Sequence, residues 1–265
     1  MRPALYIIAI LCWILQSCDA NSTDNAGKGE TDSAATERTY ILQPWKDTIN
    51  HIYAWQGNLD GKYPVLMWYK EFGDVVKGSL FYTENKNPRP INLLGTIQDN
   101  RYRILEIWPD GDISGIWEFE PDAHAAEGRW TSPTGDETYS TSLMRTDTAV
   151  TVPGIDAKAD ISGTYVYSYG TTGAQGHMTV IKKAEHIVVS FDNVSAAPAR
   201  NLAILDATEL PLAGNEAIYR SEGFGPCAIR IRFYQGFAVV DYVDGKMDCG
   251  FGNGATAAGV YVKLN

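Results

Sequence analysis

Short segments in which apolar and polar residues alternate follow one another along most of the chain from Tyr40 onward. Gly, Asn, Asp and Pro separate these segments, which recur about every 10 to 15 residues, a spacing typical of antiparallel strands rather than of strands alternating with helices. Only residues 43–55 have a weakly helical pattern. The sequence therefore predicts an all-β protein, with strands over residues 63–72, 75–84, 91–98, 102–108, 113–120, 127–132, 138–144, 163–169, 176–183, 186–194, 216–221, 227–234, 237–243 and 259–265.

A segment of mostly small residues divides these strands into two series. Residues 146–159 read TDTAVTVPGIDAKA and contain one proline and one glycine, a composition typical of a linker. We therefore expect two small antiparallel β-domains, each a meander that closes or nearly closes into a barrel, because closure removes exposed strand edges. Their expected bounds are residues 39–147 and 160–265, joined by a linker over residues 148–159. A single continuous β-structure is the alternative.

The start of the chain has a different pattern, an apolar run followed by a polar one. Arg2 precedes an apolar stretch over residues 5–15, which has the length of a signal-peptide core and is shorter than the roughly 20 residues of a membrane helix. The sequence LQSC at residues 15–18 resembles the lipobox of bacterial lipoproteins, in which cleavage falls before the cysteine and its thiol receives a lipid. The resemblance implies a signal peptide over residues 1–17 and a lipid anchor on Cys18. An ordinary secretory signal cleaved nearby is the alternative.

The composition after this cysteine bears on location and partners. Residues 18–38 are rich in Ser, Thr, Asp, Ala and Gly and nearly free of large apolar residues, so they predict a disordered tether behind the lipidated cysteine. The formal net charge is -10, which disfavours a nucleic-acid partner because acidic proteins repel phosphate backbones. We expect a protein anchored to a membrane of the bacterial cell envelope, at the outer membrane or the periplasmic face.

The cysteine count predicts one disulfide. Of the four cysteines, Cys12 lies in the expected signal peptide and Cys18 is the expected lipid acceptor, which leaves Cys227 and Cys249. These two flank a segment that predicts two strands around Gln235-Gly236, and such a hairpin would bring them near each other. An extracytoplasmic location permits their oxidation. Zinc binding is the alternative, disfavoured because no paired spacing with these cysteines occurs among His51, His124, His177 and His186.

No motif in the sequence assembles a catalytic centre. The chain lacks a G-x-S-x-G elbow and an H-E-x-x-H pair, and no cysteine remains once the disulfide is counted. We therefore predict no catalytic residue, no metal and no cofactor. A pair of carboxylates acting on a glycan stays open, because the sequence spacing of 32 acidic residues does not give their separation in space.

Tryptophans gather in the first predicted domain and are the best candidates for ligand contacts. Trp117 shares a strand face with Phe119 and Trp68 shares one with Leu66, so alternation predicts that both tryptophans are internal. Outward-facing members of the group would form a flat platform of the kind on which sugars stack, whereas inward-facing ones would fill the core. The candidates for the platform are Trp45, Trp55, Trp108 and Trp130.

Three resemblances are carried by motifs in the expected mature chain. The run C-G-F-G-x-G from Cys249, followed by G-x-Y-x-K, is similar to a closing segment of uncharacterised bacterial envelope proteins. The first-domain segments YPVLMWY, GSLFY, INLLGTI and EGRWTS resemble small β-domains of exported proteins, and neither likeness implies a reaction. The sequence S-G-T-Y from Ser162 to Tyr165 resembles the S-G-x-x-Y loop of lipoproteins that inhibit lysozyme, although the tyrosine comes one position early and the family's T-K-G motif is absent.

Together these patterns predict a lipid-anchored envelope protein that binds a protein or a glycan and catalyses no reaction. A lysozyme-inhibitor-like protein, with Ser162 and Tyr165 as contact residues, is one alternative. A glycan-active hydrolase that uses paired carboxylates is the other.

Overall fold

The computed structural model describes residues 52–86, 89–146 and 160–264. Every regular secondary-structure element in these ranges is a β-strand, which confirms the predicted all-β class. The described part of the chain contains no helix with the length and apolarity needed to cross a bilayer. The predicted signal peptide, the lipidation site Cys18 and the tether lie outside the described residues.

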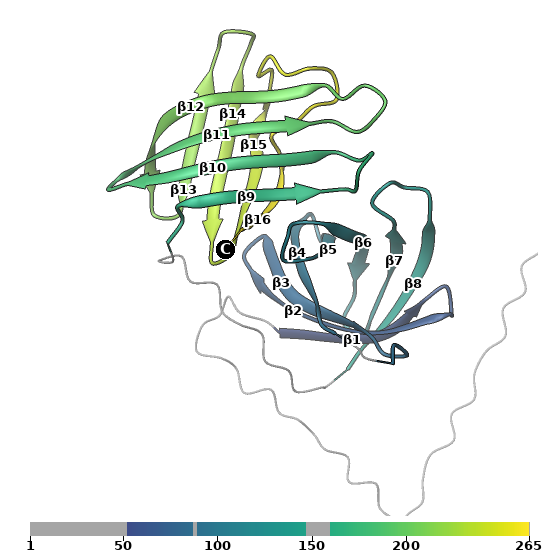
Figure 1. The fold of residues 1–265 in the computed structure, drawn as a ribbon. Helices are drawn as coiled ribbons and strands as arrows, with labels where there is room; N and C mark the ends of the chain where they lie inside the picture. The colour runs from purple at the N-terminus through teal and green to yellow at the C-terminus, as the bar shows by residue number, and fades with distance from the viewer. Residues whose placement is uncertain (1–51, 87–88, 147–159, 265) are drawn as a thin grey trace, which may run out of the picture. The chain divides into compact units, whose positions relative to one another are not determined.

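The first eight strands form a closed antiparallel barrel (Figure 1). Each strand pairs with the next along the chain, and β1 also pairs with β8 to close the cylinder. The order of the strands in the sheet is therefore their order in the sequence. The strands are β1 (Ile52–Leu59), β2 (Tyr63–Phe72), β3 (Val75–Tyr82), β4 (Ile91–Gln98), β5 (Arg101–Ile107), β6 (Ile113–Pro121), β7 (Ala125–Thr131) and β8 (Thr138–Arg145).

The remaining strands form a second closed antiparallel barrel with the same sequential order (Figure 1). Here β9 pairs with both β10 and β16, although only two residue pairs join β16 to β9. The two barrel-like units expected from the alternation are therefore present. The strands are β9 (Gly163–Ser168), β10 (Gln175–Lys183), β11 (His186–Val194), β12 (Leu202–Ala213), β13 (Glu216–Ser221), β14 (Cys227–Tyr234), β15 (Phe237–Met247) and β16 (Gly259–Lys263).

Large aromatic side chains fill the interior of the first barrel. Trp55, Tyr69 and Trp117 are among its fully buried residues, and Tyr69 and Trp117 each stand between half-buried neighbours in their strands, as the pleat of a strand requires. Glycines allow the strands to approach one another where the sheet curves. A Cβ added at Gly78 or Gly128 would lie 2.1 Å or 2.0 Å from a carbonyl oxygen of the neighbouring strand, so only glycine fits at either position.

The two ends of the second barrel differ in the length of their connections. Residues 184–185, 214–215 and 235–236 make two-residue turns at one end, whereas residues 169–174, 195–201, 222–226 and 248–258 form longer loops at the other. Loops on a rigid barrel are the usual carriers of binding sites.

Three expectations about individual segments are wrong. Residues 52–55 belong to strand β1, so the weakly helical pattern over residues 43–55 does not form a helix there. A strand that the alternation missed, β12, lies between β11 and β13. Trp68 is half-buried, because the buried face of β2 carries Val65, Met67 and Tyr69 instead. Trp117 is fully buried, as expected.

Candidate functional site

The tryptophans proposed as a sugar platform do not form one in the described residues. Trp55 and Trp130 point into the first barrel and are 1% and 8% exposed. Trp108, 39% exposed, lies just after β5 and is the one surface member of the set among the described residues. Trp45 lies outside the described residues. The described tryptophans therefore contribute mainly to the barrel core.

The two residues of the lysozyme-inhibitor resemblance are held within the second barrel. Tyr165 lies in β9 with no exposed surface, and its hydroxyl donates a hydrogen bond to the carbonyl oxygen of Ile161 at 2.8 Å. Ser162 precedes this strand, and its Oγ accepts a hydrogen bond from the backbone N–H of Lys182 at 3.0 Å. Neither residue lies on a projecting loop of the kind that enters an enzyme cleft.

The predicted disulfide is confirmed, with a Cα–Cα distance of 4.8 Å between Cys227 and Cys249. Cys227 begins β14, whereas Cys249 lies in the loop over residues 248–258, so the bond fixes one end of that loop to the barrel. The other end of the loop is held by Thr256, whose Oγ1 lies 3.1 Å from the hydroxyl oxygen of Tyr242 in β15. The loop is therefore attached to the sheet on both sides.

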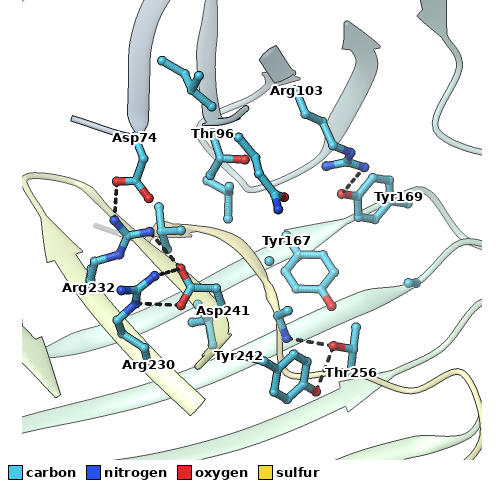
Figure 2. Close-up of a pocket in the computed structure, with 18 residues that line it drawn as sticks. Asp74, Thr96, Arg103, Tyr167, Tyr169, Arg230, Arg232, Asp241, Tyr242 and Thr256 are labelled. Atoms are coloured by element: carbon cyan, nitrogen blue, oxygen red, sulfur yellow. Dashed lines mark hydrogen bonds and ion pairs between the residues drawn. The ribbon is translucent and has the colours of Figure 1, made fainter. Parts of the chain in front are cut away.

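A cavity of about 640 Å³ lies beside this anchored loop (Figure 2). The second barrel lines it with residues of β9, β14, β15 and β16 and with Thr256 and Ala258 of the loop. The first barrel adds Asp74, which lies between β2 and β3, and residues of β4 and β5. Cavities of this size commonly hold small molecules.

One side of the cavity is a cluster of two arginines and two aspartates (Figure 2). Arg230 and Asp241 face each other in the β14–β15 register and form two parallel hydrogen bonds, Nε to Oδ1 at 2.8 Å and Nη2 to Oδ2 at 2.9 Å. Arg232 donates from Nη2 to Asp241 Oδ2 at 2.8 Å and from Nη1 to Asp74. Charge-assisted, bidentate contacts of this kind fix side-chain orientation as well as charge.

Both guanidinium groups remain cationic. The hydrogen bonds to Asp241 raise the pKa of Arg230. Burial by itself would lower the pKa of Arg232, but its hydrogen bond to Asp74 and the nearby charges outweigh burial and raise that pKa further. The two aspartates balance these two charges, so the cluster offers the cavity oriented, charged N–H donors.

The opposite side of the cavity is aromatic and hydroxylic (Figure 2). The half-buried rings of Tyr169 and Tyr242 line it, together with the hydroxyl of Thr256. The Tyr169 hydroxyl accepts a hydrogen bond from Arg103 Nη2 at 3.4 Å. Tyr167 is almost fully buried beneath them and has a strongly raised pKa, chiefly because of burial, so it forms part of the floor. Aromatic surface and polar groups thus face each other across the cavity.

A second polar cluster lies inside the first barrel, around Glu106. This side chain is 2% exposed, and its Oε1 accepts hydrogen bonds from Tyr82 Oη at 2.7 Å, Trp117 Nε1 at 2.8 Å and Trp130 Nε1 at 2.9 Å. Ser114 Oγ donates to Oε2 at 3.1 Å. Burial raises the pKa of Glu106 in spite of these four donors, which favour the ionised form. The four hydrogen bonds hold this carboxylate and the donor side chains in place inside the barrel, and they leave little room for a ligand.

No sequence pattern indicated Glu106 as a buried residue, and only some of the residues that line the cavity could be anticipated from sequence patterns. Within the described ranges, no three His, Cys, Asp or Glu side chains are placed to hold a metal ion.

Comparisons with protein-family models, with curated proteins and with solved structures found no match to this chain.

Proposed function

We propose that the protein is a lipid-anchored, non-catalytic binding protein of the bacterial cell envelope, and that its ligand is a glycan held in the cavity beside residues 248–258. The observation that carries this proposal is the composition of the cavity wall, in which the rings of Tyr169 and Tyr242 face the guanidinium groups of Arg230 and Arg232. Sugar-binding sites need both kinds of group, because a sugar presents apolar C–H faces and a rim of hydroxyl groups.

The roles of the cavity carboxylates favour binding over hydrolysis. Asp241 accepts hydrogen bonds from both Arg230 and Arg232, and Asp74 accepts one from Arg232. A glycosidase needs one carboxyl group that donates a proton and a second that attacks the sugar or activates water. Carboxylates that already bind guanidinium groups are better placed to orient the arginines than to perform either step.

The disulfide supports a location outside the cytoplasm. Disulfides persist in oxidising compartments and are rare where thiols are kept reduced, so the Cys227–Cys249 bond agrees with export directed by the lipobox-like segment. Attachment through Cys18, with residues 18–38 as the tether, would hold the two barrels near the membrane surface. The expected partners are thus the membrane, through the lipid, and an envelope glycan.

The direct test is a binding assay on the full chain, purified with its lipid in detergent and immobilised on a biosensor. A panel of neutral and acidic oligosaccharides should yield saturable binding for at least one class, and parallel incubations should release no reducing sugar. Released sugar would overturn the non-catalytic assignment, and absence of saturable binding across the panel would overturn the glycan assignment.

A ring substitution tests whether the cavity is the binding site. Tyr169→Ala removes a cavity ring and should weaken binding about tenfold, since stacking of a sugar on an aromatic ring contributes about 1 kcal/mol or more. Tyr63→Ala removes an exposed tyrosine of β2, which does not line the cavity, and should leave binding unchanged. Equal losses for both variants would place the binding site elsewhere.

A further inference from the structure

The cavity carries a charge opposite to that of the chain. Its lining contains three arginines, Arg103, Arg230 and Arg232, against two aspartates, Asp74 and Asp241, whereas the whole chain has a formal net charge of -10. The Nε atom of Arg103 also lies 3.8 Å from Oε1 of Glu118, and Arg103 still lines the cavity. A small excess of positive charge in an acidic protein draws an anion toward this one place.

The arginines also have donors that no protein group uses. Arg230 binds Asp241 through Nε and Nη2, and among the described residues its Nη1 has no acceptor. The Nε of Arg232 is buried and likewise lacks an acceptor among the described residues. Because about a third of the Arg230 side chain is exposed, its Nη1 group can reach a ligand in the cavity. Buried or half-buried guanidinium donors without acceptors are costly unless a ligand or water satisfies them.

We propose that the ligand carries a carboxylate, and that this carboxylate binds Arg230 beside the Arg232–Asp241 network while its sugar ring lies toward Tyr169 and Tyr242. This inference rests on the proposed function and adds the chemical class of the glycan, one that contains acidic sugars. The planar guanidinium group matches the two oxygens of a carboxylate, and Arg230 already holds Asp241 in this way.

The fixed aspartates favour a carboxylate over a phosphate ester. Asp74 and Asp241 lie in the same cluster, and their negative charges repel an incoming anion more strongly as its charge rises. A carboxylate brings one negative charge, which the excess of one positive charge in the lining balances. A phosphate monoester brings up to two, so it should bind less well.

The inference is tested by changing the ligand and leaving the protein intact. The probes are an oligosaccharide containing glucuronic acid, the same oligosaccharide with its carboxyl group reduced to a primary alcohol, and the phosphate monoester of that alcohol. The full lipidated chain in detergent should bind the carboxylated form at least about tenfold more tightly than the reduced form, as expected for hydrogen bonds to a charged group. It should also bind the carboxylated form more tightly than the phosphate ester.

Variants at Arg230 then locate the contact. Arg230→Gln should remove the preference for the carboxylated probe, so that the ratio of its affinities for the carboxylated and reduced probes approaches one. Arg230→Lys, which keeps the charge without the planar fork, should retain part of the preference. Arg101→Gln changes an exposed arginine of β5 that does not line this cavity and should bind like the wild type.

Each other result contradicts one specific claim. Equal binding of the carboxylated and reduced probes would overturn the acidic-sugar inference and leave the proposed function standing. Tighter binding of the phosphate ester would overturn the choice of carboxylate. Failure of all three probes, together with failure of the wider panel, would overturn the proposed function itself.

Discussion

Replacing Glu106 tests the physical account of the first barrel most severely. Its carboxylate is the common acceptor for the indole N–H groups of Trp117 and Trp130 and for the hydroxyls of Tyr82 and Ser114. Glu106→Ala leaves these donors without their acceptor, and both indoles are buried. An unsatisfied buried donor costs about 1 to 3 kcal/mol, so we expect a loss of about 4 kcal/mol of unfolding free energy after partial rescue by water.

Glu106→Gln separates the hydrogen bonds from the charge. The amide keeps an oxygen for the indole and tyrosine donors, so at neutral pH the loss should be about 1 kcal/mol and far below that of Glu106→Ala. Burial raises the pKa of Glu106 above its ordinary value of 4.5. Between pH 4.5 and the native pKa, Glu106 is therefore protonated in the native state and ionised in the unfolded state. Wild-type stability relative to Glu106→Gln should therefore be greatest below pH 4.5 and fall as pH rises through the native pKa, by at most about 1.4 kcal/mol per pH unit.

Urea unfolding followed by tryptophan fluorescence reports these differences in the first barrel and not in the second, because residues 160–264 contain no tryptophan. The assay is run from pH 4 to 8 on the wild type and both variants. Glu118→Gln, on the outer face of neighbouring β6, is the matched control and should change stability by about 0.5 kcal/mol or less. The reasoning is refuted if Glu106→Ala costs less than about 1 kcal/mol, or if wild type and Glu106→Gln keep a constant difference at every pH.

The other predictions concern the anchor, the disulfide and the curvature of the sheet. Cys18→Ala should abolish incorporation of a radiolabelled fatty acid, and retained label would contradict lipidation at this residue. Replacing Cys227 and Cys249 together by serine should lower the unfolding free energy of the second barrel, followed by circular dichroism, by about 3 kcal/mol for a 22-residue separation; a change below about 1 kcal/mol would count against the loop-closure account. Gly78→Ala places a Cβ 2.1 Å from a carbonyl oxygen of β2 and should cost about 2 to 3 kcal/mol, whereas Gly223→Ala, which meets no atom closer than 3.7 Å, should cost less than about 1 kcal/mol. Similar losses for the two glycine variants would show that close strand approach is not the cause.

Part of the candidate site could be predicted from the sequence, because a two-residue turn fixes register. With Gln235-Gly236 as the turn, counting back along both strands places Arg230 opposite Asp241, as observed. The same count would place Cys227 opposite Asp244, but the register shifts between Cys227 and Ile229 and pairs Cys227 with Met247, close to Cys249. The contribution of Asp74 could not be predicted, since 158 residues separate it from Arg232 and only the tertiary structure brings them together.

The errors have equally local causes. Strand β2 carries large apolar residues on both faces, so alternation alone could not decide whether Trp68 or Tyr69 points inward. Strand β12 contains Pro211 and the acidic residues Asp206 and Glu209, and its pairing with β11 shifts register between Val189 and Phe191, so its alternation is interrupted. Glu106 follows Ile104 and Leu105 in β5, where an acidic residue ordinarily predicts a solvent-facing position.

The assignment of this cavity as the glycan site can be tested by hydrogen exchange followed by mass spectrometry. The full chain is compared with and without the tightest-binding oligosaccharide of the panel. We predict slower exchange in peptides covering residues 227–263, which contain β14, β15, the disulfide-anchored loop and β16, and no change in peptides covering residues 125–145. Binding without protection in residues 227–263, or with protection confined to the first barrel away from the cavity, would contradict the assignment of this cavity as the glycan site.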